Sequence, residues 1–226
     1  MTVKHVLFVL TNTAHIGPQQ RRTGYFFAEV AHPWEVLDHA GIAVEFASPL
    51  GGTPPEDAYD ETDPAQRAFR ESDAFRRMAR SRKLSEIDVA DYDAIFFPGG
   101  LGPMGDIATD PDVKQAVLRA WNAGKIVSAV CHGPVAFAGV KLEDGTPFLK
   151  GRRVTSFSNA EEDGYAKADV PFLLESALVD EGARYEKAGL WEAKVVVDGR
   201  LMTGQNPASG APLAREIVTA LKREAA

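Results

Sequence analysis

Short apolar runs alternate along the chain with segments of helical periodicity, and this alternation limits the fold more than any other feature. Apolar runs without polar interruption are typical of strands buried on both faces, as in parallel sheets that helices cover. We therefore predict an α/β fold, a three-layer sandwich with a mostly parallel sheet and helices on both faces. The expected strands are Val3–Thr11, Ala43–Ser48, Ala94–Pro98, Ile126–Val130, Val154–Phe157, Arg184–Lys187 and Lys194–Thr203. The expected helices are Phe26–His39, Pro111–Ala123, Pro134–Val140, Pro171–Glu181 and Ala208–Lys222.

The last expected strand region contains a turn signal. Asp198-Gly199 lies between the apolar runs Val195–Val197 and Leu201–Met202. Asp-Gly suits the positive φ angles of a two-residue hairpin turn. We predict an antiparallel hairpin at one edge of the sheet.

The length of 226 residues, with 45% hydrophobic residues, is enough for one sizeable core. We expect a single domain over residues 1–226. The segment from about 51 to 91 interrupts the alternation, because Pro54, Pro55 and many charges precede a helical stretch, Pro64–Arg82, with little apolar surface. We expect a surface excursion there; composition favours a solvated connection over a cap on the site.

Charge and hydropathy exclude several classes of partner. The chain has 32 acidic and 25 basic residues, a net charge of -7, and we find no Lys or Arg run suited to phosphates, so nucleic acid is not an expected partner. No apolar run approaches the ~20 residues of a membrane span, and we expect a cytoplasmic protein without a membrane partner. The single cysteine excludes an intrachain disulfide and a thiolate metal cluster within one chain.

That cysteine, Cys131, follows the apolar strand Ile126–Val130 and precedes His132, Gly133 and Pro134. A sharp strand-to-helix turn with small neighbours is the nucleophile elbow, which presents a side chain at the carboxyl edge of a sheet. The start of a helix also favours a thiolate. The alternative, a buried small hydrophobic cysteine, does not account for the imidazole that follows. We predict that Cys131 is a nucleophile assisted by His132.

A second apolar strand, Ile95–Pro98, opens into Gly99-Gly100-Leu101-Gly102. Glycines at the carboxyl end of a strand let backbone N–H groups face a cleft. With a thiolate nearby, the N–H groups of Gly100 and His132 are candidates for an oxyanion hole. Without the cysteine motif the same residues would be an ordinary βα turn, and they lack the Lys and Ser/Thr of a phosphate-binding loop.

Glu29 is a carboxylate within a strongly apolar helical start. A carboxyl buried there would have a raised pKa and suit proton transfer, whereas periodicity alone equally allows a glutamate that faces solvent. His32, three residues on, gives no metal site because no second ligand pair accompanies it. A further acid, Glu161 or Glu162, could orient His132 to complete a triad, and the residues alone do not choose between the two.

Several motifs in order resemble the ThiJ/PfpI superfamily, whose sheet is flavodoxin-like and of the class I glutamine amidotransferase type. The likeness is strongest to its heat-shock chaperone branch with glyoxalase III activity. The motifs that carry it are Thr23–Trp34, Phe97–Gly100, Ala129–Pro134, Val154–Glu162 and Asp198–Ser209. Relatives commonly have His where this chain has Leu101, so we expect an apolar replacement in the pocket lining.

The resemblance implies that Cys131 is the nucleophile, Glu29 the acid that moves protons, His132 the triad imidazole and Glu162 the better match for the triad carboxylate. It implies a glutathione-independent glyoxalase, a lyase with possible deglycase activity, that converts methylglyoxal or similar α-oxoaldehydes to hydroxy acids through a Cys131 hemithioacetal. It implies no metal or organic cofactor, a small reactive carbonyl substrate and a homodimer. The alternatives are a holding chaperone, a cysteine redox sensor, or a cysteine hydrolase or hydratase.

Overall fold

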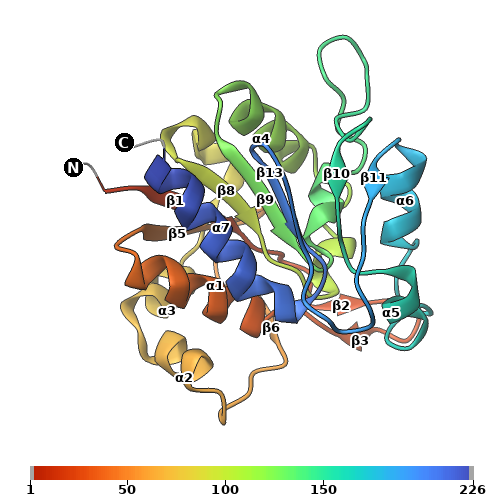
Figure 1. Cartoon of the computed structure of the whole chain (residues 1–226). Coiled ribbons are helices and arrows are strands. Elements are labelled where there is room, and N and C mark those ends of the chain that lie inside the picture. The colour runs from red at the N-terminus through yellow and green to blue at the C-terminus, as the bar shows by residue number, and fades with distance from the viewer. Residues whose placement is uncertain (1–2, 224–226) are drawn as a thin grey trace.

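A seven-stranded sheet crosses the centre of the molecule, as the apolar runs predicted (Figure 1). The structure is a computed structural model that describes residues 3–223. The strand order is β12-β13-β9-β8-β1-β5-β7, and all neighbouring pairs are parallel except β12–β13. The strands are β12 (Val195–Asp198), β13 (Leu201–Gly204), β9 (Ile126–Val130), β8 (Ala94–Phe97), β1 (His5–Val9), β5 (Ala43–Ser48) and β7 (Arg82–Lys83).

Helices cover both faces of this sheet, which confirms the flavodoxin-like three-layer architecture (Figure 1). On one face α1 (Ala28–His39) packs along α7 (Gly210–Arg223). On the other face α4 (Pro111–Asn122) packs against β8 and β9. Asp110 begins α4 with a side chain that accepts hydrogen bonds from the next turn, followed by Pro111 at the first helical position.

Strand β1 shows why the sequence makes two cores. Val6 and Phe8 point into the apolar cluster under α1 and α7, whereas Leu7 and Val9 point into the cluster under α4. Successive side chains of a strand alternate between faces, so a fully apolar run fills both layers. All four side chains are completely buried.

The predicted edge hairpin is confirmed. Strands β12 and β13 pair antiparallel with Asp198 opposite Leu201, and Gly199 in the turn has φ +61°. On its other side β13 pairs in parallel with β9, so the hairpin forms one edge of the sheet. The carboxyl end of β13 therefore lies beside the carboxyl end of β9, where Cys131 follows.

The segment 51–91 buries more apolar surface in the core than its composition led us to expect. The helical stretch is two helices, α2 (Pro64–Glu71) and α3 (Asp73–Met78), separated at Ser72, whose side chain accepts a hydrogen bond from the backbone N–H of Phe75 and caps α3. Phe69 and Met78 are buried in the cluster under α1, so the expectation of little apolar surface was wrong. The segment then adds β7 to the sheet and ends in two short 3₁₀ turns, η1 (Leu84–Glu86) and η2 (Val89–Asp91).

Three expected elements differ from the structure. The strands expected at Val154–Phe157 and Arg184–Lys187 do not join the main sheet. They are shorter than expected and pair in parallel with each other, as β10 (Arg153–Val154) and β11 (Arg184–Tyr185). The helix expected at Pro134–Val140 is a five-residue 3₁₀ helix, η4 (Gly133–Phe137).

The remaining elements lie in the connections outside the main sheet. They are β2 (His15–Ile16), β3 (Arg21–Arg22), β4 (Tyr25–Phe26), β6 (Glu56–Asp57), η3 (Gly102–Met104), α5 (Asn159–Asp163), α6 (Leu174–Asp180) and η5 (Pro207–Ser209). Of those labelled in Figure 1, β2, β3, β6 and α5 lie near the carboxyl end of the sheet and α6 lies beside β11. Strand β4 pairs with β6, so the segment 51–91 lies against the chain that leads into α1. Among residues 3–223, no helix combines the length and the apolar character that a membrane crossing requires.

Candidate active site

Cys131 occupies the predicted strand-to-turn position directly after β9, with a left-handed φ of +60°. Its N–H donates to the carbonyl of Gly204 at 3.0 Å, and its carbonyl accepts from the N–H of Phe157 at 2.8 Å. A non-glycine residue in this conformation is strained and needs such support from its surroundings. Gly133 is required nearby, because a Cβ there would lie 2.1 Å from the carbonyl oxygen of Phe97.

His132 links the cysteine to one of the two candidate acids. Its Nδ1 lies 3.4 Å from the Sγ of Cys131, and its Nε2 lies 2.7 Å from Oε2 of Glu162. Both side chains of the His132–Glu162 pair are buried. A carboxylate on Nε2 holds the proton on that nitrogen and leaves Nδ1 free to accept from the thiol. Glu162, as the resemblance implied, is the carboxylate that contacts His132.

Glu161 is used elsewhere. Its carboxylate accepts hydrogen bonds from Ser158, from the N–H of Trp191, and from the side-chain amides of Gln205 and Asn206. With Ser158 it forms a capping box at the start of α5. The spacing Ser-x-x-Glu in the sequence is the signal that could have separated the two glutamates, because a capping box uses the third residue after the cap. Glu161 therefore joins three loops around the site and does not reach His132.

Glu29 lies in the first turn of α1 and is completely buried, so the solvent-facing alternative is wrong. Its Oε2 accepts the N–H of Gly99 at 2.7 Å, and its carboxyl shares a hydrogen bond with the Cys131 thiol. Oε1 has no hydrogen-bond partner among the residues that the structure describes. Burial raises the pKa of Glu29 from 4.5 to about 8, although both hydrogen bonds lower it. At neutral pH the carboxyl is thus largely protonated.

The Cys131 thiol has its own raised pKa. Burial and the neighbouring Glu29 carboxylate raise it, whereas the backbone N–H groups of Gly100 and His132 lower it. The element that follows is a short 3₁₀ helix, so the helix dipole expected from the sequence contributes little. Two acids in contact in a buried site do not both ionise, and the pair carries at most one negative charge near neutral pH.

The backbone N–H groups of Gly100 and His132 both donate to the Cys131 sulfur. Gly100 has φ +95°, and a Cβ on it would lie 2.4 Å from the carbonyl oxygen of Gly24. Only glycine satisfies both constraints. These two N–H groups are candidates to bind negative charge on an atom bonded to the Cys131 sulfur.

Leu101 was expected to line the pocket, but it packs elsewhere. Its side chain is completely buried and belongs to the apolar cluster under α4, together with Met104 and Ile107. Cys131 belongs to the cluster on the other face. The leucine therefore packs in the core under α4.

An aromatic group near His132 was missed by the sequence analysis. The ring of Phe157 lies 4.5 Å from the His132 ring, and Tyr165 and Trp191 pack on Phe157 at 5.7 and 5.4 Å. Burial is the main cause that raises the pKa of Tyr165 to about 12. These residues come from separate loops, so no sequence pattern brings them together.

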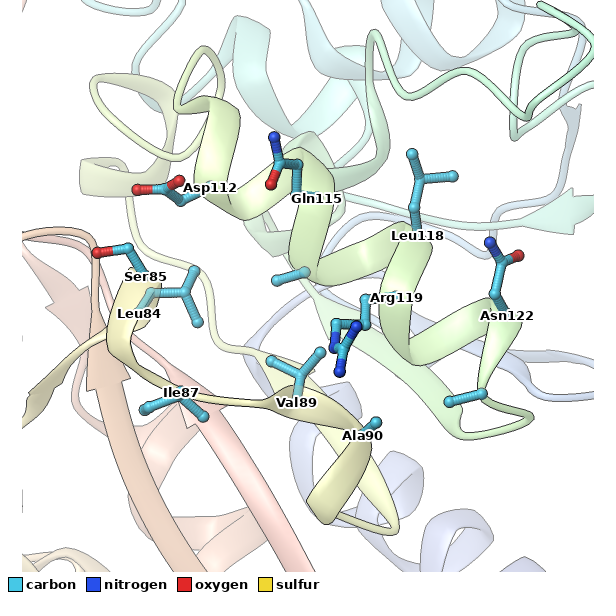
Figure 2. A pocket seen from close by; sticks show the side chains of 12 residues that line it. Leu84, Ser85, Ile87, Val89, Ala90, Asp112, Gln115, Leu118, Arg119 and Asn122 are labelled. Carbon is cyan, nitrogen blue, oxygen red and sulfur yellow. The ribbon is translucent and has the colours of Figure 1, made fainter.

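The site is enclosed. Cys131 is 4% exposed, and Glu29 and His132 are completely buried. The cavity in Figure 2, of about 710 Å³, lies between α4 and the segment 84–90, where Leu84, Val89 and Arg119 are among its lining residues. It contains none of the candidate residues. Within residues 3–223 no three His, Cys, Asp or Glu side chains gather in a way that could hold a metal ion.

Comparisons with known proteins find relatives that match almost the whole chain. Residues 24–220 match the DJ-1/PfpI family. Glyoxalase 3 of Candida albicans is 30% identical over 215 residues, which cover 89% of this chain and 91% of that protein. Glutathione-independent glyoxalase HSP31 of Saccharomyces cerevisiae is 29% identical and covers 98% of this chain and 100% of its own. The structure of Rapid Encystment Protein 24 KDa from Francisella tularensis has a TM-score of 0.92 at 32% identity, covering 97% of this chain and 99% of that one.

Proposed function

The chain belongs to the DJ-1/PfpI family, and on that premise we propose that it is a cysteine-dependent glutathione-independent glyoxalase. Its substrates are methylglyoxal or similar α-oxoaldehydes, and its products are hydroxy acids. The observation that carries the proposal is the buried contact between the Cys131 thiol and the Glu29 carboxyl, whose pKa of about 8 suits proton transfer near neutral pH. The enclosed site favours a substrate of few atoms.

In the first step the Cys131 sulfur attacks the aldehyde carbon. The reactive form of the Cys131–Glu29 pair holds a single proton, which makes it the minor form at neutral pH because both pKa values are raised; this proton moves to the aldehyde oxygen and completes the hemithioacetal. Negative charge that develops on this oxygen is bound by the N–H groups of Gly100 and His132. Loss of the shared proton leaves Glu29 as a carboxylate, ready to act as a base.

In the second step the Glu29 carboxylate removes the proton from the carbon bonded to sulfur. The electrons move to the adjacent carbonyl and give an enediolate; the hydroxyl proton on the first carbon passes to the oxygen of the second carbon, and Glu29 returns its proton to the second carbon. The product is a thioester of the hydroxy acid with Cys131. A group with a pKa near the working pH both accepts and returns a proton, and the Glu29 pKa of about 8 meets this condition.

In the last step water hydrolyses the thioester. His132, held by Glu162 at 2.7 Å, takes a proton from the water and gives it to the departing sulfur of Cys131. The balance of the three steps is one water added to one α-oxoaldehyde, with the thiol regenerated. Side chains supply every proton movement, so the proposed route needs no metal or organic cofactor.

We also propose a cytoplasmic homodimer. The free thiol on which the reaction depends persists in a reducing compartment. Large apolar side chains are exposed at Leu50, Leu190 and Trp191, which suits contact with a second copy. Light scattering at several protein concentrations tests the dimer, and a monomer at all of them would contradict it.

The proposed activity is tested by lactate formation from methylglyoxal without glutathione. Cys131→Ala should lower kcat/KM by about a thousandfold or more, because no nucleophile remains. Glu29→Gln should do the same, while the matched variant of an exposed glutamate, Glu61→Gln, should retain full turnover. Lactate formation by Cys131→Ala at the wild-type rate would refute the proposal.

A further inference from the structure

A second cavity, remote in sequence from the candidate active site, is surrounded by arginines. Its volume is about 810 Å³, and it lies over α3, β5 and β7. The lining residues are Glu45, Phe46, Asp73, Phe75, Arg76, Arg77, Ala79, Arg80 and Arg82. We call this cavity the arginine groove; it contains none of the proposed catalytic residues.

The backbone that carries the arginines is anchored to the protein interior by buried side chains and hydrogen bonds. Ala74 and Met78 lie on the inner side of α3 and are buried. Ser81 and Gly52 exchange backbone hydrogen bonds of 2.9 Å, and the Ser81 hydroxyl bonds to Ser48. The arginines therefore project from a rigid support, and their placement relative to one another does not depend on a flexible loop.

The arginines are short of carboxylate partners. Arg76 pairs with Asp73. Arg77 donates to the carbonyl of Val44, and Arg82 donates to a backbone carbonyl. Within residues 3–223, no ion pair involves Arg77, Arg80 or Arg82.

The acidic side chains of the groove do not offset the positive charge of its arginines. Four arginines face two carboxylates, and Glu45 is already bonded to His5 and to the hydroxyl of Tyr92. The chain as a whole has a net charge of -7, so the groove is a local positive site on an acidic protein. Residues 76–83 carry five basic side chains within eight positions.

We propose that the arginine groove binds a small anion that carries two or more phosphate groups, held by Arg77, Arg80 and Arg82. Guanidinium groups match phosphate oxygens with paired hydrogen bonds, and several of them around one cavity favour several phosphates over one. The volume lies in the range of small-ligand sites, and Phe75 supplies an apolar wall beside the charges. The proposal is independent of the catalytic function, because no catalytic residue takes part.

Isothermal titration of the full chain at constant ionic strength tests this binding. Inorganic triphosphate should bind about tenfold or more tighter than orthophosphate, because it engages more than one arginine. A variant with Arg77→Ala, Arg80→Ala and Arg82→Ala should weaken triphosphate binding by about tenfold or more. Turnover of methylglyoxal should stay unchanged, since these exposed residues are outside the proposed machinery.

The matched control removes the same charge from exposed arginines elsewhere, with Arg67→Ala, Arg184→Ala and Arg215→Ala. It should bind triphosphate as the wild type does. The single variant Arg80→Glu, at a guanidinium without an ion pair, should also weaken binding while leaving the fold intact. Equal losses in the control and the groove variant, no saturable binding, or binding only to long polyanions such as RNA would overturn the proposal.

Discussion

Replacement of Glu29 by Gln should change how the stability of the protein depends on pH. The amide keeps the shape of the side chain and an oxygen that accepts the Gly99 N–H, but it does not ionise. In the wild type the folded protein holds the Glu29 proton up to about pH 8, whereas the unfolded chain releases it near 4.5. The Glu29 contribution to stability is therefore present below pH 4.5 and is lost as the pH rises to about 8.

The size of this loss follows from the two pKa values. Since one pKa unit corresponds to 1.36 kcal/mol, the rise from 4.5 to about 8 removes about 5 kcal/mol of unfolding free energy between these pH values. The Gln side chain does not ionise, so the unfolding free energy of Glu29→Gln does not fall in this way. The unfolding free energy of the variant minus that of the wild type should therefore rise by about 5 kcal/mol between pH 4.5 and about 8. Titrating groups that do not interact with Glu29 are common to both proteins and cancel in the difference.

Urea unfolding at several pH values from about 5 to 8 measures the effect, with matched slopes as the check for two-state behaviour. Glu61→Gln, at an exposed position, serves as the control and should differ from the wild type by a constant amount. A constant difference between Glu29→Gln and the wild type across this pH range would refute the burial argument for the raised pKa of Glu29.

Three further outcomes follow from the same geometry. Glu162→Gln should lower kcat about a hundredfold with little change in KM, because His132 loses its charged partner; steady-state kinetics with kcat unchanged would contradict this. Gly99→Ala should reduce thermal stability by about 1–3 kcal/mol and turnover as well, since its Cβ would lie 2.6 Å from the Glu29 Oε2; an unchanged melting temperature would argue against it. Because the Glu29 carboxylate raises the pKa of the Cys131 thiol, Glu29→Gln should move the pH midpoint of iodoacetamide alkylation downwards, not upwards.

Local signals predicted the centre of the fold well. The mostly apolar runs predicted β9 and β5 with their observed bounds, and Asp198-Gly199 predicted the edge hairpin. Cys131 was found because the strand, the nucleophile and the small residues after it are contiguous. In such cases the physical cause lies within a few neighbouring residues.

Where the cause is a contact between distant segments, the sequence was less informative. Phe69 looked like part of a solvated excursion, but the hydrophobic cluster under α1 buries it. The sequence left open whether Glu29 is buried or faces solvent. Helical periodicity does not reveal that Gly99, 70 residues away, donates to its carboxylate. The arrangement of Phe157 and Trp191 also depends on loops that only the folded chain brings together.

The most direct test of the central claim is rapid-quench mass spectrometry of the protein mixed with methylglyoxal. The account assigns bond formation to Cys131 and the subsequent proton transfer to Glu29. It therefore predicts that Glu29→Gln accumulates a substrate adduct on the peptide that contains Cys131 and releases no lactate, while the wild type turns over. Lactate release by Glu29→Gln at the wild-type rate, or the absence of any adduct on that peptide, would contradict the account.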